Sequence, residues 1–136
     1  MATTTVTLSI SSGDLTGDAL ALSSTTNINK AGTTTGLDQT TGVARKFFAS
    51  TQSNTALIAA AEYTDDKAHK VYIKNISTTA SEFVTIKIGA TEVGRLYAGD
   101  FLFLPWSADT TGTAADIDID TSAVNMTVEY LVIYEA

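Results

Sequence analysis

In the stretch Lys70-Val71-Tyr72-Ile73-Lys74, apolar and polar side chains alternate, with the valine and isoleucine on one side and the tyrosine and lysines on the other. A period of two gives a strand one face in the core and one face in water, as in antiparallel sheets. Phe83–Ile88 and Met126–Tyr134 continue the same alternation. The second half of the chain therefore predicts an all-β protein.

About eight strands are expected along the 136 residues, with turn residues between them. Short strands spaced about 8–12 residues apart favour an antiparallel β-sandwich or jelly roll over parallel βαβ units. A chain of this length is expected to form one domain, spanning residues 1–136. The expected strands cover residues 5–11, 43–50, 70–75, 83–88, 92–97, 101–104, 114–120 and 125–134.

Residues 23–42 are polar and low in complexity, with threonine clusters separated by Gly32, Gly36 and Gly42. We expect a long Thr/Gly-rich loop or arm here. It is either an exposed loop or an extended arm that lies across a neighbouring subunit, because loops of this length are uncommon unless functional or disordered. In the second case, partner contacts are expected from Asn27, Lys30, Leu37 and Val43.

Two other segments have an ambiguous pattern. Residues 15–22 fit a strand, irregular structure or a single helical turn, with strand or irregular structure favoured. Residues 56–63 fit a period of two, but their alanines also fit a short helix. Gly94 interrupts the alternation of its strand and indicates a β-bulge.

Composition and charge exclude several classes of function. The net charge is −7 and the eight basic residues are scattered, so binding to nucleic acid is not expected. The chain has no cysteine, which rules out disulfides, thiolate metal sites and cysteine nucleophiles. It has no apolar run of about 18 residues and no signal-peptide pattern, so we expect synthesis in the cytoplasm and no membrane span.

Candidate catalytic and metal-binding residues are few. Asp116, Asp118 and Asp120 begin like a calcium loop, but an EF-hand would need glycine and glutamate where Thr121 and Thr127 stand. The simpler interpretation is a solvated stripe of aspartates that protects an edge strand from unwanted pairing. The only histidine, His69, is expected at the surface, and no catalytic motif is present. The sequence predicts neither an enzyme nor a bound cofactor.

Phe101-Leu102-Phe103-Leu104-Pro105-Trp106 is the most apolar run of the chain. It does not alternate, so the strand is either central in the sandwich or covered on one face by another chain. Pro105 should end the strand and leave Trp106 at its rim. Core closure, a protein interface and stacking on a sugar all remain open for these aromatic residues. Phe101, Phe103 and Trp106 are the candidate anchors for a partner.

Three segments of the chain resemble small virion structural proteins of tailed bacteriophages, most closely those of marine cyanophages. They are Asp66-Lys67-Ala68-His69-Lys70-Val71-Tyr72-Ile73-Lys74-Asn75, then Gly94-Arg95-Leu96-Tyr97-Ala98-Gly99-Asp100, then Leu104-Pro105-Trp106. The similarity covers about the last 75 residues. It carries no catalytic motif and implies a repetitive, symmetric binding partner, such as a capsid or another virion protein.

These observations together predict a non-enzymatic structural virion protein that forms a homo-oligomer. A capsid decoration (cement) protein that binds and stabilises the phage head is the leading hypothesis. The alternative is a carbohydrate-binding or receptor-binding module of a head or tail fibre, for which Tyr72, Tyr97 and Trp106 would supply exposed aromatic rings.

Overall fold

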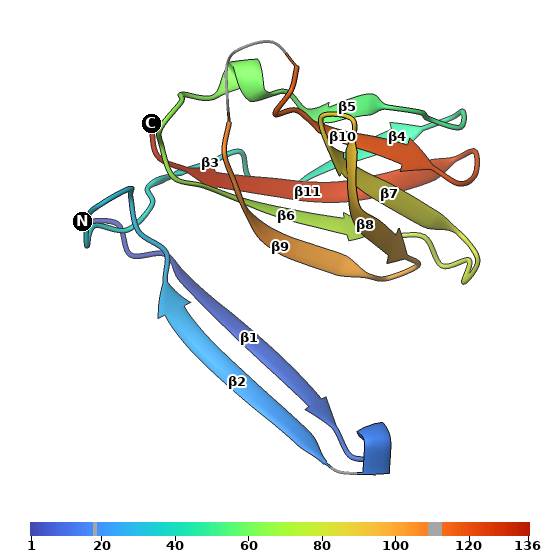
Figure 1. The fold of residues 1–136 in the computed structure, drawn as a ribbon, viewed down its shortest axis with the longest axis horizontal. Coiled ribbons are helices and arrows are strands. Elements are labelled where there is room, and N and C mark those ends of the chain that lie inside the picture. The colour runs from blue at the N-terminus through green and yellow to red at the C-terminus, as the bar shows by residue number, and fades with distance from the viewer. Residues whose placement is uncertain (18, 109–112) are drawn as a thin grey trace.

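The structure, a computed structural model, describes residues 1–17, 19–108 and 113–136. Strands dominate it, and two short 3-10 helices complete the regular structure of the described residues (Figure 1). The elements are β1 (Thr5–Ser12), η1 (Leu15–Gly17), β2 (Leu20–Asn27), β3 (Gln39–Thr40), β4 (Ala44–Phe48), β5 (Thr55–Ile58), η2 (Ala60–Glu62), β6 (His69–Asn75), β7 (Phe83–Ile88), β8 (Thr91–Tyr97), β9 (Phe101–Trp106), β10 (Ile117–Thr121) and β11 (Met126–Tyr134).

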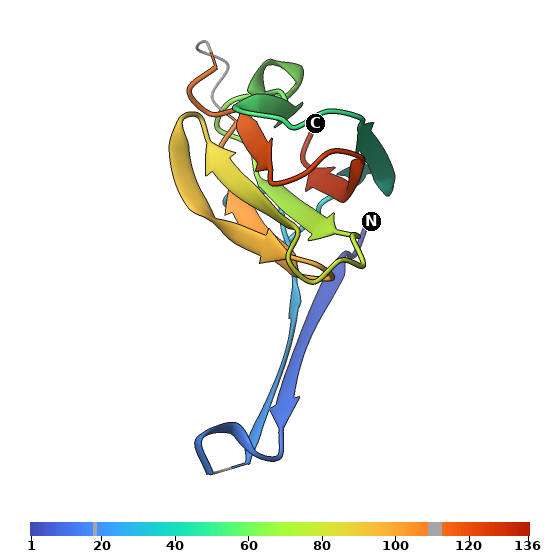
Figure 2. The same ribbon diagram turned by 90° about the vertical axis from the view of Figure 1, so that its right-hand side faces the viewer.

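Among the described residues, all strand pairs are antiparallel and form three sheets. The first large sheet has the order β3-β11-β6-β9, and β4 also pairs with β11. The second has the order β5-β10-β7-β8. The third contains only β1 and β2, a hairpin that points away from the two large sheets in both ribbon views (Figures 1 and 2). The predicted all-β antiparallel class is confirmed.

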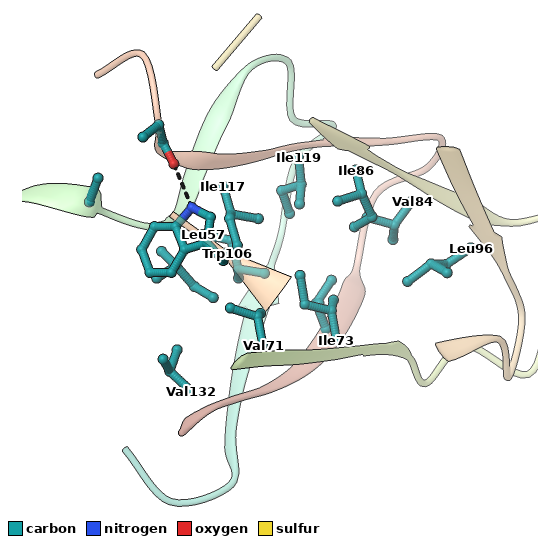
Figure 3. Packing of buried hydrophobic residues seen from close by; sticks show 14 of the residues in the cluster. Leu57, Val71, Ile73, Val84, Ile86, Leu96, Trp106, Ile117, Ile119 and Val132 are labelled. Carbon is teal, nitrogen blue, oxygen red and sulfur yellow. Dashed lines mark hydrogen bonds between the residues drawn. The ribbon is translucent and has the colours of Figure 1, made fainter. Parts of the chain in front are cut away.

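The core lies between the two large sheets. Both sheets contribute to it the side chains that point inward at every second position of their strands. Val71 and Ile73 of β6 face Ile117 and Ile119 of β10, and all four are fully buried (Figure 3). Alternation explains why these residues meet, because successive side chains of a strand point to opposite faces. The buried core cluster begins at Phe48 and takes no residue from the hairpin.

The C-terminal strand is central in its sheet, and the predicted β-bulge of β8 is confirmed. The C-terminal strand β11 lies inside its sheet, between β6 on one side and β3 and β4 on the other. The register of β7 and β8 shifts next to Gly94, because Ile86 pairs with Gly94 and Lys87 with Glu92. Val93 is therefore the extra residue of the predicted β-bulge.

The turn between β7 and β8 requires glycine. Gly89 and Ala90 join the paired residues Ile88 and Thr91, and Gly89 has a φ of 57°, a left-handed value that favours glycine. A Cβ at this position would lie 2.6 Å from the carbonyl oxygen of Ala114. Gly89 thus both closes the hairpin and lets the chain before β10 approach closely.

Several segments differ from the expectations drawn from the sequence. The predicted loop at residues 23–42 splits into the end of β2, a compact turn, and β3. The two ambiguous segments each contain a 3-10 helix next to a strand: η1 before β2, and η2 after β5. β9 is an edge strand rather than a central one, since β6 is its only partner among the described strands.

Candidate functional site

The hairpin of β1 and β2 presents an uncovered apolar face. Ile10 pairs with Leu22 and Ser12 with Leu20, so the large side chains of both strands share one face, which also carries Val6 and Leu8. Leu8, Ile10, Leu20 and Leu22 are each 40–47% exposed. We call Val6, Leu8, Ile10, Leu20 and Leu22 the apolar hairpin face. The opposite face consists of threonine, serine, asparagine and alanine.

The base of the hairpin is held by main-chain hydrogen bonds between its flanking residues and by one bond to the Glu135 side chain of the body. The Ile28 amide donates to the Thr4 carbonyl (2.9 Å), and the Leu37 amide donates to the Ile28 carbonyl (3.0 Å). Ile28 and Leu37 are buried, and Glu135 at the end of the chain accepts a hydrogen bond from the Ala31 amide (3.0 Å). The hairpin is therefore held at one end and extends from there.

The N-terminal residues can approach the base of the hairpin closely because residue 36 is glycine. A Cβ there would lie 2.6 Å from the Ala2 carbonyl oxygen and 3.1 Å from Thr3 Cα and the Thr4 amide nitrogen. The N-terminal residues thus lie directly against the turn that follows β2. Only glycine leaves room for this packing without a backbone shift.

The outer side of β9 continues the exposed apolar surface. Phe101 is 58% exposed and Phe103 is also exposed, while Leu102 and Leu104 point to the core cluster. Residues 8–11 of β1 and residues 101–103 of β9 line one shared hollow. We call this the hairpin–β9 hollow. It places the apolar hairpin face and the exposed phenylalanines of β9 next to each other.

This combined surface carries no charge. The strand sequences of β1, β2 and β9 contain no Asp, Glu, Lys, Arg or His. By contrast, β4 carries Arg45 and Lys46, and the edge strand β8 carries Glu92 and Arg95. An uncharged surface of large apolar side chains suits burial against another macromolecule.

The predicted contact residues are distributed unevenly over this region. Phe101 and Phe103 lie at the hollow, and Asn27 lies at the end of β2, where it accepts a hydrogen bond from Thr5 (2.9 Å). Val43 is exposed beside β4, and Lys30 forms an ion pair with Asp38 (2.6 Å). Of these residues, Asn27 belongs to the hairpin itself, and Phe101 and Phe103 share the hollow with it.

Trp106 and Leu37, two other predicted contact residues, are buried. Trp106 is 4% exposed and lies in the core rather than at an exposed rim, because alternation along β9 places it on the same side as Leu102 and Leu104. Leu37 is 1% exposed, since it packs at the base of the hairpin. Neither side chain offers a surface to a partner.

The three aromatic residues expected to bind a sugar do not form a common platform. Tyr72 lies on β6 and donates a hydrogen bond to Glu129 (3.1 Å), whereas Tyr97 lies on β8 in the other sheet and packs against Phe83. Trp106 is in the core. Stacking on one sugar ring requires exposed faces that lie together, which this arrangement does not provide.

The expected solvated stripe of aspartates is wrong for two of its three members. β10 lies inside its sheet, between β5 and β7, and Asp116 and Asp118 are buried. Asp116 accepts a hydrogen bond from the Ala60 amide (2.8 Å), so it holds η2 on the sheet. Burial is the main cause that raises the pKa of Asp118, and the neighbouring Asp116 raises it further. Asp120 forms an ion pair with Lys87 (2.6 Å).

His69 is buried and not at the surface as expected. It begins β6 on the same side as Val71 and lies among the rings of Tyr63, Trp106 and Tyr134, with centroid distances of 5.5, 5.7 and 6.4 Å. Neither ring nitrogen has a hydrogen-bond partner in the part of the chain that the structure describes. Burial is the main cause that lowers the pKa of His69, and it also raises the pKa of Tyr63 to about 12.

The described ranges contain neither a cluster of metal-binding side chains nor a helix that could span a membrane. Residues 1–17, 19–108 and 113–136 contain no group of three or more His, Cys, Asp or Glu side chains placed to hold a metal ion. None of the helices in these ranges is long and apolar enough to span a bilayer.

The hairpin is the main feature that sequence reasoning missed. Its first strand was expected from the alternation of Val6, Leu8 and Ile10, but its partner strand was placed partly in the polar loop. The signal was the pair Leu20 and Leu22, which continues the period of two into the Ser/Thr segment.

Searches of protein-family models, curated proteins and solved structures find no match to this chain.

Proposed function

We propose that this chain is a non-enzymatic structural protein that acts by attachment, and that it decorates the head of a tailed bacteriophage. The observation that carries the proposal is the hairpin of β1 and β2, which projects from the sandwich with an uncovered apolar face. The exposed apolar side chains of this face favour burial against a partner.

An isolated two-stranded hairpin is only marginally stable in water, because each strand pairs with a single neighbour and no other element packs on the hairpin. Here four leucine and isoleucine side chains on that face remain 40–47% exposed. Burying each such side chain gains about 1.5–3 kcal/mol relative to full exposure, so roughly half of this gain is still available to a partner. A surface of this kind marks a site of macromolecular contact.

The phage setting has a separate basis. It rests on the resemblance of residues 66–75, 94–100 and 104–106 to small virion proteins of tailed phages. These residues lie in β6, β8, β9 and the turns beside them, which build the sandwich rather than the hairpin. A head offers many identical sites, so a modest gain per contact adds up over the whole shell.

Binding to purified heads tests the proposal. Heads of a tailed phage prepared without this protein are mixed with the purified chain, and the bound fraction is measured by co-sedimentation. We expect saturable binding by the wild type and strong loss of binding in the double variant Leu8→Ser/Ile10→Ser, which removes two large side chains from the apolar hairpin face. The matched control, Thr7→Ser/Thr25→Ser, changes a directly opposed pair on the polar face and should bind normally.

Two outcomes contradict the proposal. Absence of saturable binding by the wild type rejects the phage-head setting. Equal binding by the wild type and by Leu8→Ser/Ile10→Ser, with both proteins folded, rejects the hairpin as the attachment element.

A further inference from the structure

We propose that the hairpin is an exchange element: the apolar hairpin face of one copy covers the hairpin–β9 hollow of a second copy, and the contact is reciprocal. This inference rests on the proposed role of the hairpin in attachment and makes that role indirect: the hairpin joins two copies of this chain into the dimer that binds the head. The exchange itself does not depend on the phage setting.

The hollow is bordered by two unpaired strand edges. It is lined by consecutive residues of β1 (8–11) and of β9 (101–103), and consecutive residues of a strand point to opposite faces. The hollow therefore lies alongside the strands, where their edges are open, and not over one face alone. Among the described strands, β1 pairs with β2 alone and β9 with β6 alone.

These open edges lack the protection that other edges of the same molecule have. Natural proteins guard exposed edges with charged side chains, bulges or proline. β8 carries Glu92, Arg95 and a bulge, and β4 carries Arg45 and Lys46. β1 has no charge or proline, and β9 has only Pro105 near its end. The two edges that border the hollow are thus unguarded, apart from Pro105.

Charge favours a second copy at this surface. Each chain carries a net charge of −7, so two copies repel each other wherever their acidic surfaces meet. The strands β1, β2 and β9 carry no ionisable side chain, and contact through them brings no like charges together. Contact through these strands therefore avoids the repulsion between acidic surfaces.

The available area also matches a dimer. A pair of eight-residue strands is about 26 Å long and about 10 Å wide, so one face covers on the order of 250 Å². Two reciprocal contacts remove at most about 1,000 Å² in total, the size at which specific interfaces begin, because Leu8 and Ile10 belong both to the hairpin face and to the hollow. One copy supplies both a donor hairpin and an acceptor edge, as a closed two-fold dimer requires.

The first test is the mass of the full chain in solution, measured by light scattering over a dilution series. We expect a dimer, with twice the chain mass of 14.3 kDa. We test Leu8→Ser/Ile10→Ser on the hairpin face and Phe101→Ser/Phe103→Ser on β9. Each double variant should raise the dissociation constant at least about a hundredfold, because it removes large side chains that the dimer contact would bury. The polar-face control Thr7→Ser/Thr25→Ser, an opposed pair outside the hollow, should remain dimeric.

The second test identifies the contacting residues. The chain has no cysteine, so a cysteine at Ile10 of one protein and a cysteine at Phe103 of a size-tagged second protein can be linked only between copies. With a short bis-maleimide, we expect a mixed product from Ile10→Cys and Phe103→Cys. Thr78→Cys, at an exposed position of the loop between β6 and β7, should give no such product with Phe103→Cys.

The outcomes separate this inference from the proposed function. A wild-type monomer at all concentrations, or a dimer that neither pair of serine variants weakens, overturns the exchange. A monomer that binds heads saturably overturns the exchange and supports the proposed function. A cross-linked dimer without affinity for heads supports the exchange and rejects the phage-head setting.

Discussion

The indole Nε1 of Trp106 donates a hydrogen bond to the main-chain carbonyl of Ala115 over 2.8 Å, inside the core between the two large sheets (Figure 3). This bond ties the end of β9 to the segment that leads into β10, and thus one sheet to the other. It also satisfies the one polar group of the indole, which buried tryptophans generally require.

Replacing Trp106 with phenylalanine should therefore destabilise the fold. The change leaves the Ala115 carbonyl without its donor and opens a cavity, and we expect a loss of about 2–4 kcal/mol in the free energy of unfolding. Guanidinium denaturation followed by circular dichroism measures it. Phe101→Leu, on the exposed side of the same strand, is the control and should lose less than about 1 kcal/mol. Equal losses in the two variants contradict the placement of Trp106.

The pH dependence of stability should reveal the buried His69. Burial is the main cause that lowers its pKa below the ordinary value, and Lys70 lowers the pKa further. The Lys67 backbone and Glu135 raise the pKa, but by less than burial lowers it. The unfolded chain then takes up a proton near pH 6.5 that the folded chain does not accept until a lower pH. Stability should consequently fall as the pH drops below about 6.5, by at most about 1.4 kcal/mol per pH unit from this group.

The matched variant for this prediction is His69→Phe, which keeps an aromatic ring beside Tyr63 and Trp106 but cannot titrate. Unfolding free energies of both proteins are measured between pH 7.5 and pH 5.5. We expect the wild type to lose more stability than the variant over this window. Parallel curves would show that His69 is not buried in its neutral form.

The sequence predicted the strands of the body well, because alternation is a local property. Val71 and Ile73 were expected to share one face of their strand, and both are buried in the core. Residues 43–50 were expected as a strand, and the same alternation holds there, since Phe47 is exposed and Phe48 is buried. Each of these predictions depends only on which residues are two positions apart.

Features that depend on distant segments were not predictable in this way. Whether β9 is central or at an edge depends on which strands pair with it, and its one pairing, with β6, joins residues about 30 positions apart. Asp116 looked solvated, but η2 covers it and its carboxylate caps the Ala60 amide. Leu37 lies in a polar segment and is buried because the N-terminal residues fold back on it. No local pattern contains this information.

Gly36 should be the least replaceable glycine near the base of the hairpin. Alanine there would place its Cβ 2.6 Å from the Ala2 carbonyl oxygen, which is backbone and cannot rotate away. We expect Gly36→Ala to displace the N-terminal residues and speed hydrogen exchange at the Ile28 amide, which bonds to Thr4, with a local cost of about 1–3 kcal/mol. Gly13→Ala is the control, because a Cβ at Gly13 meets no atom within 4 Å. Equal exchange in both variants would contradict the packing of the N-terminus on Gly36.

Shortening the hairpin should separate association from folding. Thr7 pairs with Thr25, so replacing residues 8–24 with Asn-Gly closes a two-residue turn in the existing register. The core cluster begins at Phe48 and takes nothing from the hairpin, so we expect the free energy of unfolding to change by less than about 1 kcal/mol. Trp106 is the only tryptophan and lies in this core, so its fluorescence reports the unfolding of the body.

The comparison is made at high dilution, since dimerisation would stabilise the wild type by mass action. At higher concentration the wild type should gain stability and the shortened chain should not. A large loss of stability in the shortened chain at high dilution would mean that the hairpin supports the sandwich itself. In that case its exposed apolar face could not be assigned to association alone.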